Sequence, residues 1–153
     1  MVGQTGVVRR DPMAMQPFCG YNFGDYWQHW LDVGAKLTKA PRIFHVNWFR
    51  RNAEGKFLWP GFGENLRVLD WVLRRCTGHA GAVDTPIGNL PHTSDLNLQG
   101  LDISAEALKQ LLAVERGLWK KEVAEVGKYL EQYGSRLPAE MVAQLKETER
   151  RLG

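Results

Sequence analysis

The stretch of sequence that decides the fold reads IFHVNWF (43–49), RRNAEGK (50–56) and FLWPGFGEN (57–65). Its first part alternates and is rich in β-forming residues, so it predicts a strand. The polar second part predicts a turn, and the third part pairs back on the first until Pro60 ends the pairing. We therefore expect a β-hairpin that leads into a glycine-bearing turn.

A helix is predicted directly after this turn, over LRVLDWVLRR (66–75). Its apolar residues Leu66, Leu69, Val72 and Leu73 share one helical face. The segment that follows is rich in Gly, Thr and Pro and has no clear periodicity, so it predicts a loop. Upstream of the hairpin the sequence predicts another helix.

That upstream helix runs from Phe23 to about Ala35, because Asn22 is a suitable N-cap for it. Its apolar face is mostly aromatic and includes Trp27 and Trp30. Aromatic residues at helical spacing are typical of a core. We therefore expect both tryptophans to be buried.

Residues 101–153 predict two amphipathic helices of balanced charge. One runs from Ser104, a good N-cap, to a glycine terminator at Tyr133-Gly134. The other follows Pro138 and runs to Arg151 with its apolar residues inward. We interpret both as packing elements, and together with the hairpin they place the chain in the α/β class.

Aromatic residues and positive charge are concentrated in the same part of the chain. Twelve of its Phe, Trp and Tyr residues lie between Phe18 and Phe62. The net charge of +3 comes from residues 1–100, which hold eleven Lys and Arg against eight Asp and Glu. This composition favours a nucleotide or single-stranded nucleic acid, because bases stack on aromatic rings and phosphates attract cations. The excess is too small to argue for duplex DNA.

Several other kinds of site lack their sequence signature. The histidines form no HExxH or HxH pattern, and Cys19 and Cys76 form no CxxC pair, so we expect neither a metal site nor a disulfide framework. A GxxxxGK[ST] phosphate loop and a G-x-S-x-G nucleophile motif are also absent. We expect Arg50 and Arg51 to lie in a solvated turn rather than to bind phosphate. No apolar run is long enough to span a bilayer and we find no secretory signal, so we expect a cytoplasmic protein without a membrane partner.

The strongest candidate site combines aromatic residues of the hairpin with the turn that follows it. Phe49 lies on the first arm, Phe57 and Trp59 alternate on one face of the second, and the turn can bring Phe62 opposite one arm. Two facing phenyl rings would form a slot for a purine, and the carboxamide of Asn65 could read the guanine edge. The alternative is that these aromatics are core residues packed on the following helix. The residues alone leave both interpretations open.

At these residues the chain resembles a known family, the GTP-dependent phosphoenolpyruvate carboxykinases. The resemblance is to the C-terminal quarter of such enzymes and is carried, in order and spacing, by RRDPMAMQPFCGYNFGDYWQHW (9–30), PRIFHVNWFRRNAEGKFLWPGFGENLRVLDWVLRR (41–75), TPIGNLP (85–91) and NLQGLDIS (97–104). It implies the C-terminal part of a carboxykinase-like nucleotide-binding fold. Residues 1–100 would be its guanine-nucleotide-binding part and residues 101–153 a helical packing tail.

The resemblance also implies an activity and a set of binding residues. Members of the family convert oxaloacetate and GTP to phosphoenolpyruvate, GDP and CO2 in gluconeogenesis, with Mn2+ and Mg2+ as cofactors. Three phenylalanines would line the guanine pocket, and Asn65 would select guanine. The residues that the resemblance places at the nucleotide are Phe49, Phe57, Phe62, Gly63, Glu64 and Asn65.

The family's phosphate loop, metal ligands and oxaloacetate-binding arginines lie upstream of the matched region. We therefore expect no catalytic or metal-binding residue in this chain, and negligible turnover by the chain alone. Residues 1–10 resemble the trailing edge of the family's mobile lid. The expected partners are a guanine nucleotide and the N-terminal part of the enzyme. The alternative is a stand-alone, non-catalytic module that binds guanine nucleotides or single-stranded RNA.

Overall fold

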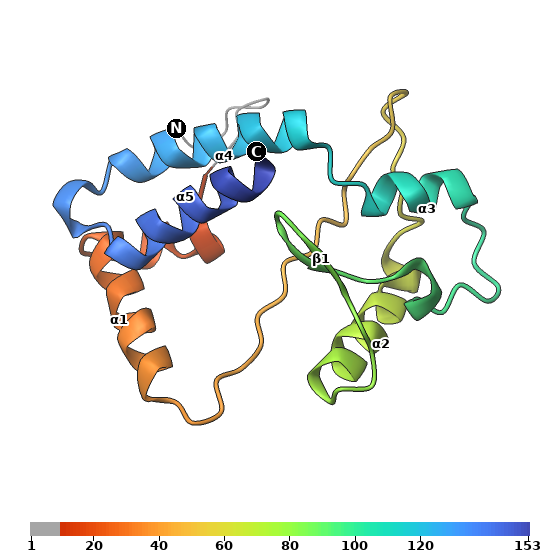
Figure 1. The fold of residues 1–153 in the computed structure, drawn as a ribbon, viewed down its shortest axis with the longest axis horizontal. Coiled ribbons are helices and arrows are strands. Elements are labelled where there is room, and N and C mark those ends of the chain that lie inside the picture. Colours follow the sequence, from red (N-terminus) through yellow and green to blue (C-terminus); the bar gives the residue numbers. More distant parts are fainter. Residues whose placement is uncertain (1–9) are drawn as a thin grey trace. The chain divides into compact units, whose positions relative to one another are not determined.

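The structure, a computed structural model, describes residues 10–153, so all but the last residue of the expected lid edge lie outside it. The described chain forms two compact units (Figure 1). The terminal unit comprises the residues up to Ala40 together with Arg116–Gly153, and the central unit is Pro41–Glu115. The division into a guanine-binding part, 1–100, and a packing tail, 101–153, stays a prediction.

The terminal unit is built from three α-helices. These helices are α1 (Phe23–Lys36), α4 (Arg116–Glu131) and α5 (Ala139–Leu152). Helices α4 and α5 pack side by side (Figure 1). A core of Phe23, Trp27, Leu130 and Tyr133 joins α1 to the end of α4. Burial raises the pKa of the Tyr133 hydroxyl.

Local signals predicted much of this unit correctly. The Asn22 side chain accepts a hydrogen bond from the Gly24 amide at 2.8 Å and caps α1 as expected. Trp27 is buried, as predicted, whereas Trp30 is 41% exposed, with its ring against Tyr26 of the same helix, so the expectation of burial was wrong for it. In α5 the terminal Leu152 is fully buried, which confirms the predicted inward face.

The central unit combines two α-helices with a short antiparallel hairpin. Its elements are α2 (Asn65–Cys76), β1 (Val83–Thr85), β2 (Gly88–Leu90) and α3 (Ala105–Leu112). Its core contains Trp71 of α2 and Leu108 of α3, with Ala80 and Leu96 between them in sequence. The leucines on the predicted apolar face of α2 are exposed, and the buried side of this helix passes through Trp71 instead.

The predicted hairpin over residues 43–59 is nearly absent, because only Arg51 and Phe57 form an isolated antiparallel bridge. Backbone pairing is limited to Arg50 with Leu58 and Asn52 with Lys56, around a turn in which the Asn52 side chain accepts from the amides of residues 54 and 56. The Asn47 side chain accepts from the Phe49 amide, so the backbone turns where the first arm was expected to continue. The mixed helix and strand composition agrees with the α/β class.

The strands β1 and β2 lie instead in the segment predicted to be a loop. They pair in the register Val83↔Leu90, Asp84↔Asn89 and Thr85↔Gly88, and two residues connect them. The Thr85 hydroxyl donates to the Gly88 carbonyl at 2.6 Å and closes this turn. Three-residue strands are too short to produce a clear alternation in the sequence.

The single long helix predicted from Ser104 is also interrupted, since α3 ends at Leu112 and α4 begins at Arg116. The Ser104 cap itself is confirmed, with its hydroxyl accepting from the Ala107 amide at 3.1 Å. Arg50 donates to the carbonyls of Leu111 and Ala113 at 3.0 and 3.1 Å. This half-buried side chain therefore stabilises the end of α3 and is not the solvated turn residue that we predicted.

Among residues 10–153 the structure contains no helix both long and apolar enough to cross a membrane.

Candidate functional site

The three phenylalanines predicted to bind a base are all exposed. Phe49 is 72%, Phe57 53% and Phe62 92% exposed, so none of them is a core residue of the described chain. Trp59, in contrast, is only 5% exposed. Phe57 and Trp59 therefore do not share a face, because the strand on which that prediction depended does not form.

Phe49 and Phe57 lie against each other with ring centroids 6.1 Å apart and an interplanar angle of 60°. Centroids at about 4.5–7 Å are typical of two rings in direct contact with each other. The two rings are too close and too tilted for a base to enter between them. The Arg51 guanidinium lies over the Phe57 ring, 4.4 Å from its centroid. These two rings offer an aromatic surface rather than a closed slot.

Phe62 is carried by the turn that precedes α2. Gly61 has φ 127° and ψ −165°, a conformation essentially reserved for glycine. Residues Phe62–Glu64 then form one 3₁₀ turn, and α2 begins at Asn65. A methyl group added at Gly63 would meet no atom within 4 Å. This turn therefore presents Phe62 and an open stretch of backbone to solvent.

Asn65 lies at the first position of α2 and is half-buried. Its Oδ1 accepts a hydrogen bond from the indole Nε1 of Trp59 at 2.9 Å. The neighbouring Glu64 forms an ion pair with Arg67, with 2.5 Å between Oε2 and Nε. The polar groups predicted to contact a base are thus held by neighbours in the chain.

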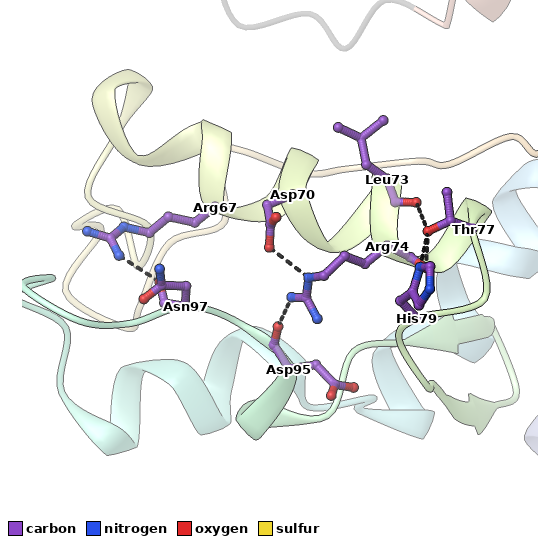
Figure 2. A network of polar contacts seen from close by, with 8 residues as sticks. All are labelled: Arg67, Asp70, Leu73, Arg74, Thr77, His79, Asp95 and Asn97. Carbon is purple, nitrogen blue, oxygen red and sulfur yellow. Dashed lines mark hydrogen bonds and ion pairs between the residues drawn. The ribbon is translucent and has the colours of Figure 1, made fainter.

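Two arginines attach α2 to the segment that precedes α3. Figure 2 shows Arg67 and Arg74 reaching from α2 to this segment, where Arg67 donates to the Asn97 carbonyl at 2.7 Å and Arg74 to the carbonyl of Asp95. Arg74 is also paired with Asp70 at 2.9 Å. Sequence reasoning missed these contacts, since they join residues 21 and 30 positions apart. They fix the orientation of the helix that carries Asn65.

The described residues of this segment supply aromatic surface and polar edges. Within residues 10–153 there is no cluster of three or more His, Cys, Asp or Glu side chains that could hold a metal ion. The residues that the structure describes therefore do not fit a two-metal centre. Exposed rings can stack on a flat ring, and a carboxamide can read its edge.

Comparisons with known proteins cover nearly the whole chain. Residues 1–151 match the family described as phosphoenolpyruvate carboxykinase C-terminal P-loop domain. The phosphoenolpyruvate carboxykinase (GTP) of Thermoplasma volcanium is 47% identical over 151 residues, which are 99% of this chain and 25% of that protein. The corresponding protein of Chlamydia felis is 50% identical over 154 residues, with coverages of 99% and 26%. That of Anaeromyxobacter dehalogenans is 49% identical over 142 residues, with coverages of 93% and 24%. The chain spans about a quarter of the length of these relatives.

Proposed function

The chain belongs to the family of GTP-dependent phosphoenolpyruvate carboxykinases, and from this premise we propose that it supplies the guanine-binding end of such an enzyme. The whole enzyme would act in the cytoplasm on oxaloacetate and GTP. Loss of CO2 from oxaloacetate leaves an enolate, whose oxygen takes the γ-phosphoryl group of GTP to give phosphoenolpyruvate and GDP. The part of this reaction that concerns the described residues is recognition of the base.

One observation carries the proposal: three phenylalanines that precede a tryptophan-held carboxamide in the sequence are all exposed. Burial of an aromatic side chain is strongly favourable, so three exposed rings in one short segment need a reason. A stacked base covers such rings and contributes roughly 1–3 kcal/mol per base. We propose that the base lies between Phe62 and the pair Phe49 and Phe57.

The polar groups of the same turn would supply selectivity. Stacking does not distinguish guanine from adenine, because every base has an aromatic face. We propose that Asn65 donates from Nδ2 to guanine O6, and that Gly63 and Glu64 border the base. Adenine carries an amino group where guanine carries O6, so the same donor would face another donor.

Phosphoryl transfer depends on positioning and on stabilisation of spreading charge. The groups that would do this are expected in the remaining three quarters of the enzyme, together with Mn2+ and Mg2+. We therefore propose that the 153 residues alone bind the nucleotide weakly and do not turn over oxaloacetate. A coupled assay of the chain with oxaloacetate, GTP and both metals should give no phosphoenolpyruvate, and measurable turnover would contradict this.

Nucleotide binding itself is tested by titrating the chain with GTP, ATP and a short RNA oligonucleotide while following tryptophan fluorescence. GTP should bind more tightly than ATP. Phe62→Ala should weaken GTP binding roughly 5- to 150-fold, the equivalent of one lost stacking contact. Phe18→Ala is the matched control, because Phe18 is similarly exposed (86%) and is not among the residues that we assign to the base.

Equal losses in Phe62→Ala and Phe18→Ala would contradict a base site at Phe62. Binding of the oligonucleotide in preference to GTP would support the stand-alone RNA-binding module instead. No response to any of the three ligands would refute nucleotide recognition by the chain on its own.

A further inference from the structure

The hydrogen bond between Trp59 and Asn65 joins a buried residue to the residue that we assign to base selection. Trp59 is 5% exposed, and its Nε1 lies 2.9 Å from Asn65 Oδ1. An indole N–H can only donate, so its partner in a carboxamide must be the oxygen. The contact therefore fixes which end of the Asn65 amide faces Trp59.

The other end of that amide is thereby determined. With Oδ1 turned toward Trp59, the Asn65 Nδ2 group is on the opposite side of the planar carboxamide, and it makes no hydrogen bond to any residue that the structure describes. A carboxamide without such a partner can turn over and offer either a donor or an acceptor. Trp59 removes that choice, so Asn65 presents two N–H donors.

We propose that Trp59 is a positioning residue for nucleotide specificity, in that its indole holds Asn65 in the donor orientation required by guanine O6. This deepens the proposed function and rests on it, since it assumes that the base lies at Asn65. Guanine O6 accepts a hydrogen bond, whereas the adenine 6-amino group donates. Without the indole, Asn65 can rotate and offer Oδ1 to the adenine amino group.

The rest of the central unit supports a fixed orientation at this point. Glu64, next to Asn65, is paired with Arg67, and Arg67 is in turn bonded to the Asn97 carbonyl at 2.7 Å. These two contacts hold the backbone at the start of α2. Rotation of the Asn65 carboxamide is restricted by its hydrogen bond to Trp59.

Trp71 provides a matched control within the same unit. It is as buried as Trp59, at 4% exposed, and its Nε1 has no hydrogen-bond partner among the described residues. Trp59→Phe and Trp71→Phe both replace a buried indole by a smaller ring. Only the first removes a hydrogen bond, so a difference in base preference between them reports on that bond and not on lost packing.

The experiment measures dissociation constants of GTP, ITP and ATP for the chain by isothermal titration calorimetry. Trp59→Phe should lower the GTP-to-ATP affinity ratio by about tenfold, the equivalent of one lost hydrogen bond. ITP keeps O6 and should weaken together with GTP. Trp71→Phe should leave the ratio unchanged. An unchanged ratio in Trp59→Phe, or ITP binding that does not weaken with GTP, would overturn the assignment.

Asn65→Ala separates the two levels of the proposal. If Asn65→Ala lowers the ratio and Trp59→Phe does not, the guanine site stands and the role of Trp59 is wrong. If neither variant changes the ratio, or the unmodified chain does not prefer GTP, the proposed guanine site itself fails and the inference fails with it.

A measurement on the unmodified chain covers the case in which Trp59→Phe does not fold. In ¹⁵N-resolved NMR spectra the Trp59 indole proton should exchange with solvent much more slowly than that of Trp30, which is 41% exposed. Addition of GTP should shift the Asn65 Nδ2 signals while the Trp59 indole proton stays protected. Exchange as fast as that of Trp30, or loss of protection on GTP binding, would overturn the proposal.

Discussion

Gly24, in the first turn of α1, is the position at which a single added methyl group should destabilise the chain most clearly. A Cβ there would lie 2.8 Å from the carbonyl carbon of Arg136 and 2.9 Å from Oδ1 of Asn22. The first neighbour is backbone, and the second is the atom that caps α1. Neither can give way as the end of a flexible side chain could, so Gly24→Ala should force α1 away from the segment at Arg136.

The expected magnitude follows from three contributions. Overpacking a close contact costs about 1–3 kcal/mol. Displacement of the Asn22 cap adds about 1 kcal/mol. The better helix propensity of alanine offsets at most about 1 kcal/mol. We therefore expect Gly24→Ala to reduce the free energy of unfolding by about 2 kcal/mol, which lowers Tm by roughly 4–8 °C in a chain of this size.

Urea unfolding followed by far-UV circular dichroism measures this change. The control is Gly34→Ala in the same helix, because a methyl group at Gly34 would meet no atom within 4 Å. Gly34→Ala should stabilise the chain by up to about 1 kcal/mol. The reasoning is refuted if Gly24→Ala is as stable as the unmodified chain, or if both variants shift stability in the same direction.

Two further predictions concern side chains that end or begin helices. Arg50→Gln removes the charged donor to the carbonyls of Leu111 and Ala113 and should reduce the free energy of unfolding by about 1–3 kcal/mol. Hydrogen exchange at the end of α3 should become faster, and unchanged exchange there would contradict the capping role of Arg50. Asn22→Ala should reduce the free energy of unfolding by about 1 kcal/mol while Asn22→Asp, which keeps an acceptor, should lose less; equal losses in urea unfolding would argue against the cap.

The features predicted correctly from sequence are those determined by neighbours in the chain. The caps at Asn22 and Ser104 bond to amides two and three residues away, so their pattern is visible in a short window. The inward face of α5 was likewise predicted from the periodic spacing of its apolar residues. Capping and periodicity are local, and they hold wherever the helix packs.

The features predicted wrongly depend on contacts between distant residues or on side chains that compete with the backbone. No strand forms over residues 43–49, and at its expected end the Asn47 side chain accepts from the Phe49 amide and closes a turn. The helix expected through residues 113–115 ends where Arg50 binds carbonyls more than sixty positions away. The Arg50 contact is too distant to be read from a short window, and the Asn47 turn competes with a strand that residue propensity favours, so longer regular elements were predicted.

At the candidate site, too, the local sequence could be read in advance whereas the arrangement in space could not. Its residues could be named from the sequence, because FLWPGFGEN combines aromatics, glycines and an asparagine within nine positions. Their arrangement in space could not be predicted, because the expected alternation along a strand placed Phe57 and Trp59 on the same face. Trp59 is instead buried and bonded to Asn65, while Phe57 is exposed. The assignment of a guanine pocket to these residues stays a prediction until nucleotide binding is measured.

Gly61 and Gly63 lie on either side of Phe62, and we expect their replacement by alanine to have different effects. The change at Gly61 should affect stability, and the change at Gly63 should affect nucleotide binding. Gly61→Ala should cost about 1–3 kcal/mol of stability, because φ 127° is strained for any side chain. Gly63 has no positive φ and open space around it, so Gly63→Ala should leave urea unfolding within roughly 0.5 kcal/mol of the unmodified chain. If the base lies against this backbone, however, the methyl group occupies its place and GTP binding should weaken. Equal GTP affinity in Gly63→Ala and the unmodified chain would refute a close approach of the base at Gly63.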